Sequence, residues 1–389
     1  MVGLWGQVPH EQPGVVSMRI ESFFEPIVYV TAKVTHGCNL KCKYCKVDSL
    51  SSRSMKMSLE TAKRAARLLI ENSSFSSLWF NMHGGEPLLL PDEWIEEVVS
   101  YARELAGKHS KEIRFPIATN GTLLPEERLL KLHKLGIDFS MSCDGPPQIH
   151  NVMRGRGATV YKTYQLFRKH KIRCGIMAVI SRGNYDKMKQ VMDWYREQAI
   201  RSFLSNFVEA QGRGVNNHLL SPQEMYESGV QILDHMCETN ISVSNDDMLR
   251  KVAWFVQGRK NGDALACPNI ECHAGRHMVS VDMDGSITTC GSADTSDYLL
   301  GHIDRDIDED KYKNVLHRFH DKGRWIIRCF DCAAKQICSH GCTTACNKSS
   351  DYRESMCQYT RMIWTHFCEH PEKANHINGI ISGRKAHYG

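Results

Sequence analysis

The sequence predicts an α/β fold with a parallel sheet, followed by a small cysteine-rich domain. Apolar runs rich in β-forming residues alternate with amphipathic segments from residue 27 onward. These amphipathic segments have the length of the helical crossovers that parallel strands need. Most of the cysteines gather after residue 266, where the sequence becomes rich in loops. A flat doubly wound sheet and a curved open barrel both fit this alternation, so periodicity leaves both open.

The expected elements follow one another in strict alternation. Strands are expected at residues 27–34, 78–82, 115–119, 139–142, 175–180 and 203–208. Helices are expected between them at 59–71, 92–109, 126–135, 160–170 and 185–198, and after them at 222–239 and 248–260. Residues 1–26 show no clear period and are expected to form an irregular extension.

Composition narrows the class of protein. The chain has 389 residues, 42% of them hydrophobic and 24% charged, which is typical of a soluble globular protein with one large and one smaller domain. The net charge of +5 is small, and no long basic run interleaves with aromatic residues, so nucleic acid is not the expected partner. No apolar stretch is long enough to span a membrane, and no secretory signal is visible, so a cytoplasmic location is expected. Disulfides are rare in that reducing compartment, so the 16 cysteines indicate metal or iron–sulfur ligation.

The first cysteine cluster follows the first expected strand. Cys38, Cys42 and Cys45 are spaced as C-x3-C-x2-C. Three thiolates on one loop can hold three corners of a cubane 4Fe–4S cluster and leave the fourth iron open to a small molecule. A structural zinc site would want a fourth nearby ligand, for which His36 is a weak candidate.

With Tyr44 before its third cysteine, this loop resembles the signature of the radical S-adenosylmethionine (SAM) superfamily. The resemblance implies a partial (β/α)6 TIM-like barrel. It also implies that the open iron chelates the amino and carboxylate groups of SAM. An electron from the cluster would then split the sulfonium to give a 5′-deoxyadenosyl radical, which abstracts hydrogen from the substrate.

Further segments occur at successive strand ends in the order of that superfamily. Gly84-Gly85-Glu86 follows the second strand, where the glycines permit close approach of the backbone to a ligand and the glutamate can accept an ammonium proton. The resemblance implies that this segment binds the SAM amino group and that Arg154 meets the SAM carboxylate. The expected cofactor-binding residues are Tyr44, Gly84, Gly85, Glu86, Asn120, Ser142, Asp144 and Arg154.

The C-terminal cysteines resemble the SPASM extension of peptide- and protein-modifying radical SAM enzymes. The matching pattern is a cysteine pair around a hairpin at Asp284-Gly285, then C-x2-C-x5-C-x3-C and a further cysteine. The resemblance implies two auxiliary 4Fe–4S clusters, three clusters in all. Auxiliary cluster I would use Cys267, Cys272, Cys290 and Cys342, and auxiliary cluster II would use Cys329, Cys332, Cys338 and Cys357. A zinc ribbon is the alternative reading of the C-x2-C pair.

Two cysteines and the domain limits complete this interpretation. Cys346 and Cys368 exceed the ligand count, and either could replace Cys357 or take no part in ligation. The expected division is an extension at 1–26, the barrel at 27–240, a bridging helix at 241–266, the SPASM domain at 267–370 and a C-terminal tail at 371–389.

The resemblance bears on the reaction as well. Anaerobic sulfatase-maturing enzymes, which oxidise a Cys or Ser side chain to formylglycine, carry an aspartate base directly after the hairpin cysteine. Here Gly291 follows Cys290, and a glycine cannot accept a proton, so Asp294 becomes the candidate base. The expected function is therefore maturation of a peptide or protein by a crosslink or an oxidation.

Alternative functions and partners remain beside this expectation. The alternatives are a sulfatase-type formylglycine maturase, a small-molecule radical SAM dehydrogenase, and a non-catalytic electron-transfer or zinc-binding protein. Low-potential electrons imply flavodoxin or ferredoxin as a donor. Few residues precede Cys38, so a peptide leader would be bound by a separate protein or by the mouth of the barrel itself.

Overall fold

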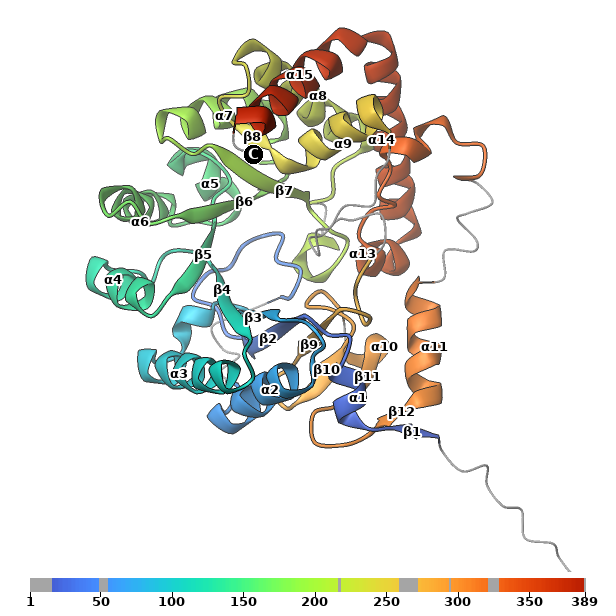
Figure 1. Cartoon of the computed structure of the whole chain (residues 1–389). Coiled ribbons are helices and arrows are strands. Elements are labelled where there is room, and N and C mark those ends of the chain that lie inside the picture. Colours follow the sequence, from blue (N-terminus) through green and yellow to red (C-terminus); the bar gives the residue numbers. More distant parts are fainter. Residues whose placement is uncertain are drawn as a thin grey trace, which may run out of the picture.

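The computed structural model describes residues 16–48, 55–215, 218–258, 272–293, 295–320 and 329–387 (Figure 1). Its strands are β1 (Ser17–Met18), β2 (Tyr29–Thr35), β3 (Ser77–Gly84), β4 (Glu112–Thr119), β5 (Ile137–Ser142), β6 (Cys174–Ile180), β7 (Ser202–Phe207), β8 (Ser244–Asn245), β9 (Met278–Val281), β10 (Ser286–Thr288), β11 (Leu299–His302) and β12 (Ile307–Asp308). The helices up to the end of the barrel are α1 (Ile20–Phe24), α2 (Leu59–Asn72), α3 (Asp92–Lys108), α4 (Glu126–Lys134), α5 (Pro147–Met153), α6 (Gly157–Lys169) and α7 (Met188–Glu197). Those that follow are α8 (Pro222–Glu238), α9 (Asp246–Gln257), α10 (Thr295–Tyr298), α11 (Glu309–His320), α13 (Thr343–Lys348), α14 (Ser350–Glu369) and α15 (Pro371–His387). Short 3-10 helices are η1 (Pro87–Leu89), η2 (Tyr185–Lys187), η3 (Gly212–Val215) and η4 (Ala333–Ile337).

The order of the strands decides between the two architectures that periodicity left open. Strands β2 to β7 lie side by side in sequence order, and each neighbouring pair is parallel. A doubly wound sheet reverses its strand order at a switch point, and this sheet does not. The chain is therefore a partial barrel, with α2, α3, α4 and α6 on its outer face (Figure 1).

The outer helices form because each has one apolar face and a defined start. In α2, Ala62, Ala65, Ala66 and Leu69 recur at helical spacing and are fully buried, and the Ser58 hydroxyl caps the helix by accepting from the Thr61 amide. The strands beneath them supply the other half of the core, with Phe80, Phe115 and Phe203 almost completely inaccessible to solvent. This packed wall fixes where each strand ends, and therefore where the loops of the barrel mouth begin.

The sheet extends beyond the six expected strands. The hairpin of β9 and β10, expected from Asp284-Gly285, places β9 parallel to β2, and β11 continues the sheet on that side. At the other edge β8 pairs with β7. The hairpin that follows Cys272 is thus built directly onto the strand that precedes Cys38. Sequence periodicity gives no information on such a long-range pairing.

Both ends of the described chain are more ordered than expected. The extension contains β1, which pairs with β12, and α1, whose Phe23 and Phe24 are buried. The expected tail is helix α15, which packs on α8 and α9 and buries Ala374 and Ile377. The division into domains stays a prediction. Within the described residues, no helix has both the length and the apolar character needed to cross a membrane.

Candidate active site

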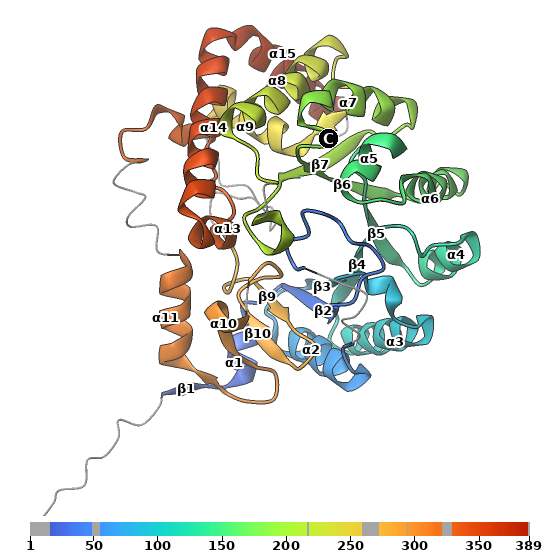
Figure 2. The ribbon, with the colours of Figure 1, turned by 180° about the vertical axis from the view of Figure 1, so that it is seen from behind.

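Three cysteines lie on the loop that leaves the carboxyl end of β2. Cys38, Cys42 and Cys45 are all partly exposed, and none of the three forms a disulfide within the described part of the chain. The loop is turned back on itself by the Cys45 amide, which donates to the Cys42 carbonyl at 3.3 Å. Figure 2 shows the loop at the mouth of the barrel, beside the segment that follows β7.

The electrostatics of the loop fit a group that binds thiolates. Burial is the main cause that raises the pKa of Cys38 and that of Cys42, the latter to about 11, and repulsion by neighbouring cysteines of the loop contributes to both shifts. A cationic iron–sulfur core offsets such repulsion, because each thiol releases its proton and the resulting thiolate binds an iron. In the described residues no three His, Cys, Asp or Glu side chains form a site for a single ion, whereas a cubane cluster takes each thiolate on a separate iron.

The two glycines after β3 bring a second loop against the first. The Gly85 amide donates to the Thr35 carbonyl at 2.7 Å, and the Glu86 amide donates to the Gly37 carbonyl at 2.8 Å. A Cβ at Gly85 would lie 2.0 Å from the Gly37 oxygen, so no larger residue fits. Gly84, with φ of +129°, adopts a conformation that side chains disfavour. The glycines therefore serve the close approach of two backbones.

The carboxylate of Glu86 is engaged inside the protein. It is completely buried and accepts from the Leu88 amide at 3.1 Å, the Thr119 hydroxyl at 2.8 Å and the Asn120 amide at 2.7 Å. Burial raises the pKa of Glu86 despite these donors. The side chain ties the ends of β3 and β4 together, and its expected contact with the SAM amino group stays a prediction.

Asn120 connects the end of β4 with the cysteine loop. Its amide nitrogen lies 3.8 Å from the Cys38 sulfur and donates to Asn39 at 2.8 Å. Its oxygen accepts from the Thr122 amide at 3.0 Å, which fixes the orientation of the side chain. An amide hydrogen aimed at a ligand sulfur is one of the levers by which a protein tunes an iron–sulfur cluster.

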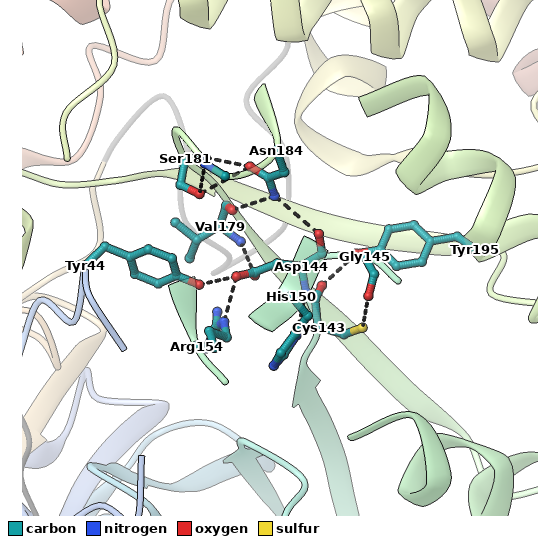
Figure 3. A network of polar contacts seen from close by, with 11 residues as sticks. Tyr44, Cys143, Asp144, Gly145, His150, Arg154, Val179, Ser181, Asn184 and Tyr195 are labelled. Atoms are coloured by element: carbon teal, nitrogen blue, oxygen red, sulfur yellow. Dashed lines mark hydrogen bonds and ion pairs between the residues drawn. The ribbon is translucent and has the colours of Figure 1, made fainter. Parts of the chain in front are cut away.

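A buried ion pair lies behind the loop (Figure 3). Asp144, two residues beyond Ser142 at the end of β5, accepts from Arg154 Nε at 2.9 Å, from the Val179 amide at 2.9 Å and from the Tyr44 hydroxyl. The guanidinium also lies over the Tyr44 ring, 5.2 Å from its centre. Burial alone would raise the pKa of Asp144, but Arg154, with other neighbours, outweighs it and lowers that pKa.

Helix α5, which was not expected from the sequence, places this arginine. Arg154 is its C-terminal cap, and the helix starts at Pro147, whose ring suits a first helical turn. Of the expected SAM contacts, Tyr44, Asp144 and Arg154 thus form one network, and Gly84, Gly85, Glu86 and Asn120 form a second around Cys38. Their contacts with SAM stay predictions.

A cavity of about 700 Å³ occupies the barrel beside the loop. Lys46, the residue after Cys45, lines it and contacts Ser292 at 2.7 Å and Glu209 at 3.6 Å. The lining of the cavity also includes Cys272, Cys290 and Cys342, from three distant parts of the chain.

The charged groups of this cavity are paired with one another. Asp247 is bonded to Lys251 at 2.7 Å, and Lys46 lies beside Glu209. His83, at the end of β3, has a buried Nδ1 without a hydrogen-bond partner among the described residues. Burial, with Lys46 and Lys33 nearby, lowers the pKa of His83 to about 4, so its ring is neutral. The cavity therefore suits a neutral ligand that can form hydrogen bonds.

The other C-terminal cysteines form a separate group. Burial raises the pKa of Cys357, and the charges of Cys338 and Cys332 raise it further. Arg361 hydrogen-bonds to Cys332. Cys329 is described and partly exposed.

The two surplus cysteines differ from each other. Cys346 is 1% exposed and one helical turn from Cys342, and burial raises its pKa to about 12, with Cys342 adding to the shift. Cys368 is exposed on α14. The expected ligand Cys267 and the candidate base Asp294 lie outside the described residues.

Several residues of the site were not found from the sequence. Lys46 directly follows the cysteine motif, which was a usable signal. Glu209, His83 and Ser292 carry no local signal, because their place in the cavity depends on contacts between distant segments.

Comparison with known proteins identifies the family. Residues 32–195 match the model of the radical SAM superfamily. The chain is 26% identical over 378 residues to the cysteine-type anaerobic sulfatase-maturating enzyme of Clostridium perfringens, covering 91% of this chain and 99% of that protein. It is 23% identical over 345 residues to the subtilosin biosynthesis protein AlbA of Bacillus subtilis (86% and 71% covered) and 25% identical over 342 residues to the mycofactocin maturase MftC of Mycobacterium tuberculosis (84% and 81%).

Solved structures agree on the fold. The native anSMEcpe structure with bound AdoMet and Cp18Cys peptide matches with a TM-score of 0.73 at 21% identity, covering 91% of this chain and 99% of that one. SuiB of Streptococcus suis, bound to its precursor peptide SuiA, matches with 0.60 at 18% identity (85% and 76% covered). Members of the superfamily use a 4Fe–4S cluster and SAM, and these are the cofactors of this chain. Residues 32–195 are thus a radical SAM domain, and the chain is a radical SAM enzyme homologous to the sulfatase-maturating enzyme, AlbA and MftC.

Proposed function

We propose that this enzyme modifies a peptide or protein substrate, held in the cavity between the cysteine loop and the C-terminal cysteines. The observation that carries the proposal is the cavity itself, which is lined both by Lys46, next to the cysteine loop, and by Cys272, Cys290 and Cys342. A radical formed beside the loop would reach a substrate there, and Cys272, Cys290 and Cys342 would hold an electron acceptor on the wall of the same cavity. The relatives AlbA and MftC and the peptide-bound structures concern peptide substrates, which supports the same class here.

Three 4Fe–4S clusters are part of the proposal. Cys38, Cys42 and Cys45 would hold the cluster that binds SAM, and Cys272, Cys290 and Cys342 with Cys267 would hold auxiliary cluster I. Cys332, Cys338 and Cys357 with Cys329 would hold auxiliary cluster II. The charges of Cys338 and Cys332 are among the groups that raise the pKa of Cys357, which supports this second group. When bound, the cluster of the loop supplies the electron that cleaves SAM to a 5′-deoxyadenosyl radical.

The side chains of the chain position and shield that chemistry. Arg154 donates to Asp144 from Nε, so its Nη groups would be presented to the SAM carboxylate. Asn120 would donate to the Cys38 sulfur, and Lys46 would hold a substrate group together with Ser292. Neutral His83 would donate or accept one hydrogen bond from the substrate, since its Nδ1 has no internal partner in the described structure. Flavodoxin or ferredoxin would supply electrons, and a separate protein or the barrel mouth itself would bind a peptide leader.

Iron analysis and a peptide assay test the proposal together. After anaerobic reconstitution the full chain should bind about twelve irons and as much sulfide, four for each cubane cluster. About four irons with zinc would contradict the auxiliary clusters. With SAM and dithionite, deuterated synthetic peptides containing Cys or Ser, and the short precursor expected to be encoded nearby, should transfer deuterium into 5′-deoxyadenosine. SAM cleavage without transfer from any peptide would contradict a peptide substrate.

Formylglycine formation is the second candidate function. Coverage of 99% of the sulfatase-maturating enzyme favours it. Gly291 speaks against it, because the acid that follows the hairpin cysteine in those enzymes is missing here. A sulfatase peptide that loses two hydrogens at its Cys or Ser would support this candidate, and a crosslinked product would exclude it for that peptide. A small-molecule dehydrogenase would leave every peptide unchanged.

A further inference from the structure

One arginine from a distant segment holds the cysteine loop at three points. Arg213, in η3 after β7, donates from Nε to the Cys42 carbonyl at 2.9 Å and from its amide to the Cys45 carbonyl at 3.0 Å. Its Nη1 also donates to Asp48 at 2.6 Å. The carbonyls of two of the three loop cysteines are therefore fixed by a single residue.

The neighbouring glycine allows this contact. Gly212 has φ of +54°, and a Cβ there would lie 2.4 Å from the Cys45 oxygen and 2.6 Å from the Lys46 oxygen. The backbone after β7 thus lies directly against the backbone of the loop, as Figure 2 shows for the two segments. No residue with a side chain can occupy this position unless the loop moves.

The segment that carries Arg213 is itself fixed at both sides. Val208 donates to the Ile180 carbonyl at 3.2 Å, and Gly214 donates to the Gln211 carbonyl at 2.9 Å. Gln211 lies 3.4 Å from the Thr344 hydroxyl, which in turn lies 3.0 Å from the Cys342 sulfur. Arg213 is therefore held by a framework that reaches from the barrel to the C-terminal cysteines.

We propose that Arg213 is a positioning residue for the cluster of the cysteine loop, which it holds in its binding conformation while placing a fixed positive charge beside it. The inference rests on the proposed function in one respect, that the loop holds a 4Fe–4S cluster. Residues that orient metal ligands typically contribute 10–100-fold in metal affinity. Hydrogen bonds and net charge near a cluster also set its reduction potential.

Two variants at Arg213 and two control variants, all in the full chain, separate this role from general stability. Arg213→Gln removes the charge and most of the contacts, and Arg213→Lys keeps the charge but not the three-point geometry. Arg182→Gln is the matched control, because Arg182 also donates Nε to a backbone carbonyl, that of Leu219 at 3.2 Å, and lies beside Glu224. A variant with all three loop cysteines changed to Ala identifies the iron and the electron paramagnetic resonance (EPR) signal that belong to the loop.

The readouts are iron loss to a chelator, the EPR change on adding SAM, and the midpoint potential. We expect Arg213→Gln to lose the loop iron roughly 10–100-fold faster, with a more negative midpoint potential and a weaker response to SAM. Arg213→Lys should lose iron faster but keep a potential close to that of the wild type, and Arg182→Gln should match the wild type. Wild-type iron loss and potential in Arg213→Gln would overturn the proposal.

Two further outcomes also decide whether the proposal holds. If Arg213→Gln does not fold, wild-type iron loss in Arg213→Lys overturns the proposal by itself. If the wild type has no iron or EPR signal that depends on the loop cysteines, the proposed cluster fails and the role of Arg213 fails with it. If the wild type has a normal loop cluster and the Arg213 variants behave like the wild type, the proposed role of Arg213 fails but the proposed function stands.

Discussion

Replacing Asp144 by Asn tests the buried ion pair behind the cysteine loop. The carboxylate accepts from Arg154, Tyr44 and the Val179 amide, and the side chains of Asp144 and Arg154 are only 3% and 10% exposed. Asn keeps the shape but removes the negative charge. The guanidinium of Arg154 would then be buried without a counter-charge. Burial lowers its pKa, and in the wild type Asp144, with Tyr44 and Cys42, outweighs this effect and raises it.

The size of the effect follows from this burial. Removing one partner of a buried pair typically costs about 3–5 kcal/mol of the free energy of unfolding. A matched surface pair is available in Arg114 and Asp138, which bond at 3.0 Å but are 61% and 43% exposed. Solvent-exposed pairs contribute about 0–1 kcal/mol, so Asp138→Asn is the control.

Unfolding of the cluster-free chain in guanidinium chloride measures the stability of both variants. The midpoint of Asp144→Asn should fall at an unchanged slope with denaturant, since the surface exposed on unfolding stays the same. The midpoint of Asp138→Asn should stay close to that of the wild type. Equal losses of stability in the two variants would refute the claim that burial makes the Asp144–Arg154 pair more important for stability than an exposed pair.

Three further predictions concern pH, the glycine contact and the surplus cysteines. Burial is the main cause that lowers the pKa values of His83 and His150 to about 4, so the unfolded chain binds more protons than the folded chain below pH 6.5. The free energy of unfolding should therefore fall as pH drops from about 6.5 to about 4. This dependence on pH should be lost when His83→Gln and His150→Gln are combined, and a wild type whose free energy of unfolding does not change across this range would contradict the prediction. Gly85→Ala should displace the cysteine loop, because its Cβ would lie 2.0 Å from the Gly37 oxygen. It should reduce the iron bound by the loop far more than Gly107→Ala, whose Cβ would have no atom within 4 Å. Equal iron content in the two variants would argue against the contact. Cys357→Ala should weaken one auxiliary cluster while Cys346→Ala keeps all the iron, and the reverse result in iron analysis would make Cys346 the ligand.

The barrel was predictable from the sequence because its signals are local. Each strand is a short apolar run, and each outer helix carries its own apolar face, as Ala62, Ala65 and Leu69 do in α2. The spacing of Cys38, Cys42 and Cys45 likewise lies within one loop, so it indicated the radical SAM family without any tertiary information.

The remainder depended on contacts between distant residues. The pairing of β9 with β2, the contact of Glu209 with Lys46 and the hold of Arg213 on Cys42 have no counterpart in local periodicity. The expectation for the chain termini differed from the structure for a related reason. Residues such as Phe23 and Ile377 are too few to form a pattern by themselves, and they gain their order from the helices that they contact.

Formation of 5′-deoxyadenosine from SAM is the most direct test of the central claim, that the Cys38, Cys42 and Cys45 loop performs radical SAM chemistry. The assay compares the anaerobically reconstituted wild type with the variant in which these three cysteines are Ala, each with SAM and dithionite. The account predicts 5′-deoxyadenosine and methionine in equal amounts from the wild type and neither from the variant. A fully reconstituted wild type that leaves SAM intact, or a variant that still cleaves it, would contradict the account.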